Sequence, residues 1–384
     1  MKSSVILTTT LAVAIRMVDA KSLWLETTPN SVMPYALTKG RGVPLGWGDT
    51  WNRFPVTGNS SGGAFCIMNT NGPGIPRNPN VTPGLFPHVH KKTYENFYAV
   101  KGRVQLWGQN YDGFLKNTST QETRILGPGD FGAIPHNAIH TFQLLEPDTQ
   151  LTGVLVPGGF EEFFFKMASP TFDFASLNKY DVYPTDGWVA RNDLKDGFAG
   201  SGNWYNGPNP LPNSSVPPSF IAKNYGPKWL NSQHGHYQIV TPFVTGNQTD
   251  QEFAQGTITI SKRTSNGSAP LLKMPRHTAF MMEEGQLSVT LAGYDTIHLI
   301  QGDVVFIPAN HEFSYFAEAE FTKFMYVSGG GDGLDAQLIK GGKTWDKAFY
   351  PQDQSQATPG FGAPGISAPL NLPAEQPRLH HVRI

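Results

Sequence analysis

The stretch that decides the fold is Pro87-His88-Val89-His90-Lys91-Lys92-Thr93-Tyr94-Glu95-Asn96-Phe97-Tyr98. Residues two apart on a β-strand point to the same face, so His88 and His90 project side by side. A short polar bend follows, and Glu95 begins a second apolar run that ends at Gly102. Two imidazoles and a carboxylate brought together in this way are ligands for a divalent transition metal.

A fourth ligand candidate, His140, lies downstream of a Gly-Asp-x4-Pro segment at residues 129–135. The combined pattern is H-x-H-x4-E-x6-G followed by G-D-x4-P-x4-H, which is the two-part motif of the cupin β-barrel. Histidines two apart also occur on exposed strand faces, but the full pattern with its spacing is specific. The sequence therefore predicts a metal site formed by His88, His90, Glu95 and His140.

The composition fits an all-β protein. The 384 residues include 29 basic and 30 acidic ones, with a formal net charge of −1. This balance does not indicate a nucleic acid or a membrane surface as partner, and no apolar run is long enough to span a bilayer. The 41 glycines and 31 prolines fit short strands joined by many turns. The length favours two domains.

Residues 1–20 are expected to be a signal peptide, with Lys2 before an apolar run and small residues up to Ala20 as the cleavage site. We therefore expect a secreted, extracellular protein. The lone Cys66 excludes an intrachain disulfide, so the hydrophobic cores must hold the fold. Six N-x-S/T sequons agree with secretion. The predicted glycosylation sites are Asn59, Asn80, Asn117, Asn213, Asn247 and Asn266.

The chain divides into four further parts by composition. Alternating apolar strands fill residues 21–169, the predicted N-terminal barrel with the metal site. Residues 170–225 are rich in Pro, Asn, Ser and Gly and are expected to be a long linker. A second strand-rich block covers residues 226–350. The segment 351–384 combines polar residues with Pro and Gly and is expected to be a disordered tail.

An internal repeat predicts a second cupin barrel. Residues 302–308 repeat residues 129–135, and the turn at Gly285 repeats the turn at Gly102. We therefore expect an all-β fold of two cupin (jelly-roll) barrels joined by the linker. Aligned on these repeats, the second barrel carries at the four ligand positions Leu271, Lys273, Thr278 and Phe313. We expect this C-terminal barrel to be metal-free and structural.

Several longer segments carry a resemblance to a known family. They are Arg53-Phe54, Val56-Thr57-Gly58, V-P-G-G-F-E at 156–161, G-P-K at 226–228, L-N-S-Q at 230–233, Q-I-V at 238–240 and D-G-L-D at 332–335. Together with the metal motif, they make the chain resemble the fungal quercetin 2,3-dioxygenases, secreted copper bicupins, from about residue 53 to residue 350. The resemblance implies one copper ion per chain, held in the first barrel, and a linker that helps to cover the active-site mouth.

The resemblance also implies an activity. Such an enzyme uses O2 to open the heterocycle of a flavonol such as quercetin and releases a depside and carbon monoxide. Glu95 would be both a metal ligand and the general base that removes the 3-hydroxyl proton, although a role as ligand only stays open. The ligand types do not identify the metal, because three imidazoles also suit manganese, iron, cobalt and nickel. The expectation of copper therefore comes from the resemblance.

The resemblance places six residues at the flavonol cavity. The strand pattern agrees for two of them, because Phe97 shares a face with Glu95 and Phe142 shares a face with His140. Ordinary barrel core is the alternative, above all for the two leucines. Asn52 stands where the family carries a tyrosine that can hydrogen-bond towards the glutamate, so it is a candidate support for Glu95. The six cavity residues are Met68, Thr70, Phe97, Phe142, Leu151 and Leu155.

Two other functions remain alternatives. One is a single-metal bicupin oxidoreductase with a different substrate, such as an oxalate oxidase or decarboxylase. The apolar inward positions and the lack of an arginine suited to a small dicarboxylate argue against it. The other is a non-catalytic bicupin that binds sugars or serves storage, which has little reason to keep a full ligand set. The sequence leaves open which flavonol is preferred and whether the chain forms a homodimer.

Overall fold

The computed structural model describes residues 21–47, 49–74, 85–168, 185–189, 191, 193–196, 209–263 and 269–351. Both barrels belong to one compact unit that ends at Tyr350. The expected signal peptide, the sequons at Asn80 and Asn266, and the tail from residue 352 lie outside the described residues. Among the described helices, none has the length and apolar character needed to cross a lipid bilayer.

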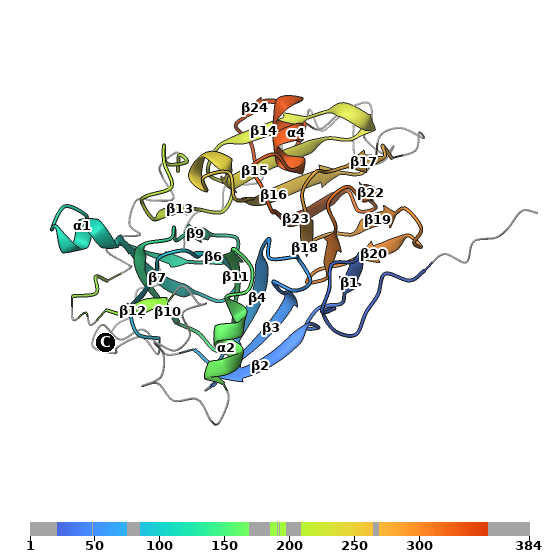
Figure 1. Ribbon diagram of the computed structural model, residues 1–384. Helices are drawn as coiled ribbons and strands as arrows, with labels where there is room; N and C mark the ends of the chain where they lie inside the picture. Colours follow the sequence, from blue (N-terminus) through green and yellow to red (C-terminus); the bar gives the residue numbers. More distant parts are fainter. Residues whose placement is uncertain are drawn as a thin grey trace, which may run out of the picture. The chain divides into compact units, whose positions relative to one another are not determined.

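The first barrel consists of a seven-stranded and a five-stranded sheet (Figure 1). The larger sheet contains β2 (Val43–Trp47), β3 (Thr50–Val56), β4 (Cys66–Gly72), β6 (Tyr94–Lys101), β9 (Phe131–Ala133), β11 (Thr149–Val156) and β13 (Ser219–Ile221). The smaller sheet contains β5 (His88–His90), β7 (Val104–Asn110), β8 (Glu122–Leu126), β10 (Ala138–Leu144) and β12 (Thr185–Trp188). Their orders are β13-β9-β6-β11-β4-β3-β2 and β12-β5-β10-β7-β8. Two short helices complete it, α1 (Tyr111–Leu115) and α2 (Glu161–Met167).

The second barrel repeats this plan with an eight-stranded and a four-stranded sheet. The larger one contains β1 (Tyr35–Leu37), β14 (Lys228–Asn231), β15 (Gln238–Val244), β16 (Ala254–Ser261), β18 (Thr278–Glu284), β21 (Val304–Ile307), β23 (Phe321–Ser328) and β24 (Lys343–Trp345). The smaller one contains β17 (Leu272–Lys273), β19 (Leu287–Leu291), β20 (Ile297–Leu299) and β22 (Glu312–Ala317). Outside the sheets lie η3 (Gln233–Gly235), η4 (Gly246–Gln248) and α4 (Leu334–Lys340). The expected all-β fold of two barrels is confirmed.

The two barrels exchange strands, which the sequence did not indicate. Strand β1 lies within the part assigned to the first barrel, yet it pairs with β21 of the second, and the Lys39 amide donates to the Asp303 carboxylate at 2.9 Å. Strand β13, which precedes the second barrel, pairs with β9 of the first, and the Lys223 amide donates to Asp130 at 2.7 Å. The aspartate of each Gly-Asp repeat therefore binds the segment that leads into the other barrel.

The stretch expected to be a linker is partly built into the first barrel. Strand β12 pairs with β5, and β13 pairs with β9. Both strands are only three or four residues long, too short to show a period-two pattern against the surrounding Pro and Asn residues. The remaining residues of this stretch, apart from 189, 191, 193–196 and 209–225, lie outside the described part of the chain.

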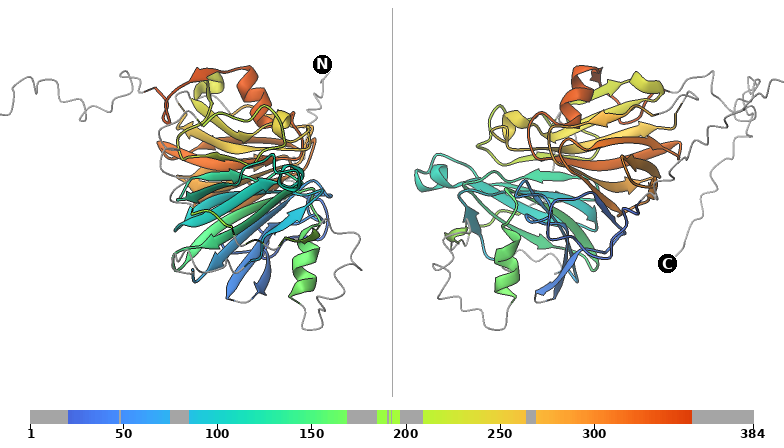
Figure 2. Two further views of the ribbon diagram at one scale, coloured as in Figure 1. Left: turned by 90° about the vertical axis from the view of Figure 1, so that its left-hand side faces the viewer. Right: turned by 45° about the vertical axis from the view of Figure 1, so that its right-hand side comes forward.

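The alternation of β6 sorts its side chains between two cores. Tyr94 and Tyr98 point into a core cluster that also contains Phe243 and Phe306 of the second barrel. Phe97 points the opposite way, into a cluster inside the first barrel, and Glu95 shares this inward face. Figure 2 shows the first barrel from two further sides, with the green helix α2 beside the blue strands β2 and β3.

Candidate metal centre

Three histidines project from one face of the smaller sheet. Strands β5 and β10 are antiparallel neighbours, with His88 opposite His140 and His90 opposite Ala138. The ring centroids lie 4.3 Å apart for His88 and His140, 4.8 Å for His88 and His90, and 5.0 Å for His90 and His140. The two-residue spacing and this register together bring three imidazoles into one cluster.

The fourth side chain comes from the facing sheet. Glu95 lies on β6, and its Oε2 atom lies 3.1 Å from Nε2 of His90 and 3.1 Å from Nε2 of His140. One ligand atom from each of His88, His90, Glu95 and His140 lies within 4.8 Å of the others, and all four residues are buried. The structure thus brings the four predicted ligands together.

Backbone carbonyls orient two of the imidazoles. Nδ1 of His88 lies 2.9 Å from the carbonyl oxygen of Phe86, and Nδ1 of His140 lies 3.0 Å from that of Ala138. A carbonyl can only accept, so Nδ1 carries a proton, and once Nε2 gives up any proton of its own it offers its lone pair to a metal. This is how protein histidines are usually held for metal binding.

The electrostatics of the cluster also suit a cation. Burial lowers the pKa of His88 well below its usual range, and the neighbouring His140 and His90 add to the effect, so the ring is neutral as a ligand must be. Burial alone would raise the pKa of Glu95, but hydrogen bonds from His140 and His90 outweigh it and hold the pKa well below its usual range. A buried carboxylate among three imidazoles fits a divalent transition metal.

The second barrel differs from its expected alignment by one residue. Leu272 pairs with Phe313, as His88 pairs with His140, so the equivalents of His88 and His90 are Leu272 and Met274. The assignment of Leu271 and Lys273 was wrong, because Thr278 follows Leu272 by six positions, whereas Glu95 follows His88 by seven. Leu272, Met274, Thr278 and Phe313 offer no imidazole or carboxylate. That this barrel is metal-free stays a prediction.

The expected cavity residues follow the inner face of the larger sheet in rows. Leu155 of β11 lies opposite Glu95. Two residues away on β11, Gly153 lies between Phe97 of β6 and Met68 of β4. Two residues further, Leu151 lies opposite Thr70 of β4. Paired residues point to the same side of a sheet, so these side chains share the face that carries Glu95. The register places them together, and their contact with a substrate stays a prediction.

Two phenyl rings adjoin the histidines. The ring centroid of Phe97 lies 6.1 Å from that of His140 and 5.5 Å from that of Phe142. Phe97 is fully buried, whereas Phe142 is partly exposed. Phe142 lies on β10 two residues after His140, on the same face of the strand, and its ring packs against that of Phe97.

Asn52 has a different partner from the one expected. The Thr70 hydroxyl donates to Oδ1 of Asn52 at 2.7 Å, and both side chains are buried. Their row lies four residues from the row of Glu95, or about 13 Å along the strands. An asparagine side chain cannot span that length. Within the described residues, Asn52 therefore supports Thr70 and not Glu95.

Phe160 adjoins the site and was not singled out from the sequence as a site residue. Its ring centroid lies 4.5 Å from that of His90, and the ring is buried. The turn before α2 is held by the Glu161 carboxylate, which accepts the amide protons of Gly58 and, at 2.8 Å, Gly159. The signal that could have identified Phe160 is its place in the V-P-G-G-F-E segment, one of the family resemblances.

Comparisons with curated proteins point to one activity. The chain is 39% identical over 364 residues to quercetin 2,3-dioxygenase from Aspergillus japonicus, and the match covers 87% of this chain and 100% of that protein. It is also 32% identical over 152 residues to quercetin 2,3-dioxygenase from Bacillus subtilis (strain 168), covering 40% of each. No family model matches the chain.

Solved structures of similar fold include two oxalate decarboxylases. The formate complex of the Lactobacillus farciminis enzyme has a TM-score of 0.48 at 14% identity, covering 79% of this chain and 88% of that one. A variant of the Bacillus subtilis enzyme also has a TM-score of 0.48 at 14% identity, covering 79% of this chain and 78% of that one. Similarity at this level carries no argument about activity.

Proposed function

The chain belongs to the quercetin 2,3-dioxygenase family, and from this premise we propose that it cleaves the heterocycle of a flavonol such as quercetin with O2. The products would be a depside and carbon monoxide, with one O2 consumed for each carbon monoxide released. The observation that carries the proposal is the convergence of three buried imidazoles and one buried carboxylate inside the first barrel.

We propose one copper ion per chain, held by His88, His90, Glu95 and His140. Three Nε2 lone pairs and a carboxylate oxygen suit copper(II), and the same donors accept other divalent transition metals. When bound, the metal supplies Lewis acidity towards the flavonol 3-oxygen and redox contact with O2. The carbonyls that hold Nδ1 of His88 and His140 keep the ligand atoms aimed at one point.

Glu95 is proposed to be the general base. It is buried at the centre of the ligand cluster, where a bound cation would keep its carboxylate ionised and therefore able to accept a proton. The hydrogen bonds that lower its pKa need a proton on Nε2 of His90 and His140, and these nitrogens lose it when they bind a metal. Glu95 Oε2 would then be left to take the proton of the flavonol 3-hydroxyl.

The walls of the first barrel suit a flat aromatic substrate. Phe97 adjoins His140 and packs against Phe142 of the facing sheet, and Met68, Leu151 and Leu155 extend the apolar surface on the face of the larger sheet that carries Phe97. Such a surface excludes water and can stack a planar ring system. The buried Asn52 and Thr70 pair adds one polar point away from the metal ligands.

Secretion and glycosylation are also proposed, and they are tested separately. The four described sequon asparagines, Asn59, Asn117, Asn213 and Asn247, are all exposed, as oligosaccharide attachment requires. Amino-terminal sequencing of the exported protein should begin at or near Lys21. Its mass should fall after glycosidase treatment. An exported protein that keeps Met1 and has the mass of the bare chain would overturn both proposals.

The decisive experiment combines metal analysis of the purified protein with quercetin turnover, followed by loss of the flavonol absorbance and release of carbon monoxide. About one copper per chain with equal amounts of O2 consumed and carbon monoxide released would support the proposal. Bound metal with no turnover of any flavonol would exclude the proposed substrate class. A protein that binds no divalent metal would exclude the proposed centre.

A further inference from the structure

The strand that carries two of the metal ligands is short and depends on its neighbours. Strand β5 has three residues, and β10 pairs with one of its edges. Strand β12 covers the other edge, with Thr185 opposite His90 and Trp188 opposite His88. The Val189 amide then donates to the Pro87 carbonyl at 2.8 Å. Without β12, the histidine strand would be the edge of its sheet.

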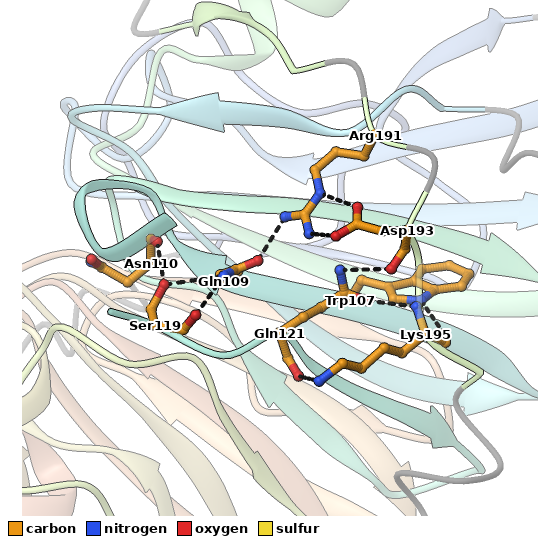
Figure 3. Close-up of polar contacts among 8 residues, drawn as sticks. All are labelled: Trp107, Gln109, Asn110, Ser119, Gln121, Arg191, Asp193 and Lys195. Carbon is orange, nitrogen blue, oxygen red and sulfur yellow. Dashed lines mark hydrogen bonds and ion pairs between the residues drawn. The ribbon is translucent and has the colours of Figure 1, made fainter. Parts of the chain in front are cut away.

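Directly after β12, a buried arginine anchors the chain. The side chain of Arg191 is 4% exposed. Its Nη1 donates to Oε1 of Gln109 at 2.6 Å, and its Nε and Nη2 donate to the two carboxylate oxygens of Asp193 at 2.7 and 2.6 Å (Figure 3). The guanidinium also lies 4.5 Å from the ring centroid of Phe114. All three of its nitrogens are thus engaged, in a geometry that a planar guanidinium provides.

The following residues continue the attachment to β7 and to the residue before β8. The Lys195 amide donates to Oε1 of Gln121 at 2.6 Å, and Nε1 of Trp107 donates to the Lys195 carbonyl at 2.7 Å (Figure 3). Gln109, the acceptor for Arg191, is itself held by the carbonyl of Ser119 at 2.9 Å. Trp107, Gln109 and Gln121 are buried.

This attachment lies on the outer face of the histidine sheet. Gln109 and Val89 both pair with Ile139. Ile139 is the residue before His140, and Val89 is the residue after His88. Neighbouring residues along a strand point to opposite faces, so the guanidinium contacts the side of the sheet opposite to the metal ligands. The sheet itself therefore separates the guanidinium from His88, His90 and His140.

We propose that Arg191 is a positioning residue for the metal centre, acting through β12. Its contacts with Gln109, Asp193 and Phe114 hold the chain at the end of β12, and β12 in turn pairs with the backbone of His88 and His90. If the arginine is lost, the end of β12 detaches and a three-residue strand becomes a sheet edge, where backbone pairs open more readily. The inference rests on the proposed metal function of His88 and His90.

The test compares Arg191→Met and Arg191→Lys with a control, Arg276→Met. Arg276 also binds an aspartate, Asp332, at 2.6 Å, but it lies in the second barrel. Arg191→Lys keeps the charge and loses the planar fork, which provides a milder variant if Arg191→Met fails to fold. Each full-length protein is loaded with one equivalent of copper(II). Two readouts follow: copper release to an excess of chelator, and amide hydrogen exchange in a peptide that spans residues 86–91.

In Arg191→Met, copper release should be at least tenfold faster than in wild type, and exchange at residues 86–91 should rise while exchange at residues 95–101 stays unchanged. Arg191→Lys should lie between, and Arg276→Met should match wild type. A lower melting temperature with unchanged copper release and unchanged exchange at 86–91 would overturn the inference, leaving Arg191 a general stabiliser. A wild-type protein that binds no copper or other divalent metal would instead refute the proposed function, and the exchange data would still test the contact with β5.

Discussion

Oε2 of Glu95 lies 3.1 Å from Nε2 of His140, although the two residues are 45 positions apart in the sequence and lie on different sheets. This proximity predicts a specific effect of Glu95→Gln. The amide oxygen can still coordinate a cation but cannot take up a proton, so turnover of quercetin should fall by about 100-fold or more, while the metal content stays close to that of wild type. Steady-state kinetics and metal analysis on the same preparation provide the measurement.

A control for that change is Glu284→Gln, at the exposed end of β18, which should keep wild-type kinetics. Wild-type turnover by the Glu95→Gln protein at neutral pH would show that Glu95 is a ligand only.

His140→Ala should weaken metal binding by more than about 100-fold. Changing a residue that only orients a metal ligand typically weakens binding by about 10- to 100-fold, and loss of a ligand should cost more. The reason is that His140 supplies one of three clustered imidazoles, which the alanine methyl cannot replace. Titration with copper(II) measures the change. His311→Ala, whose imidazole contacts the Ala292 carbonyl in the second barrel, serves as the control. If His140→Ala bound copper as tightly as wild type did, His140 would not be a ligand.

Asn52→Leu should alter substrate preference. Asn52 and Thr70 form a buried polar pair next to the apolar surface of Met68, Leu151 and Leu155. A flavonol hydroxyl that reaches this pair would gain one hydrogen bond. Loss of such a bond costs about 1 kcal/mol, so the ratio of kcat/KM for quercetin to that for galangin, which lacks the hydroxyls on the B ring, should fall about fivefold. Thr70→Val should act in the same direction. An unchanged ratio in both variants would exclude a role for the pair in recognition.

Asp335→Asn should change how stability depends on pH. Burial raises the pKa of Asp335 from 3.8 to about 6. The folded state therefore favours the protonated carboxyl, and this contribution is complete below pH 3.8 and is lost as the pH rises through 6. The neutral amide avoids that loss, so the variant should gain about 3 kcal/mol over wild type at pH 8 and much less at pH 4.

Denaturant unfolding at pH 4 and pH 8 measures this effect, with Asp295→Asn, at an exposed turn, as the control. Equal differences between the variant and wild type at both pH values would mean that Asp335 does not titrate in this range.

Much of the candidate site could be predicted because its information is local. The spacing of His88 and His90 follows from the two-residue period of a strand, and the Gly-Asp-x4-Pro repeats mark equivalent turns in both barrels. The alternation along β6 likewise predicts that Glu95 and Phe97 share a face. These relationships depend on backbone geometry over a few residues, so a motif with the right spacing determines them.

Only the tertiary structure decided the relationships that depend on strand register and on distant partners. The sequence could not show that β1 and β13 join the opposite barrels, that Leu272 rather than Leu271 faces Phe313, or that Asn52 binds Thr70. A difference of one residue in a connection reverses the face of every following side chain, and pairing between distant strands follows from the packing of the whole core. The sequence by itself determined which residues could hold a metal, and the packing of two sheets decided that their side chains meet.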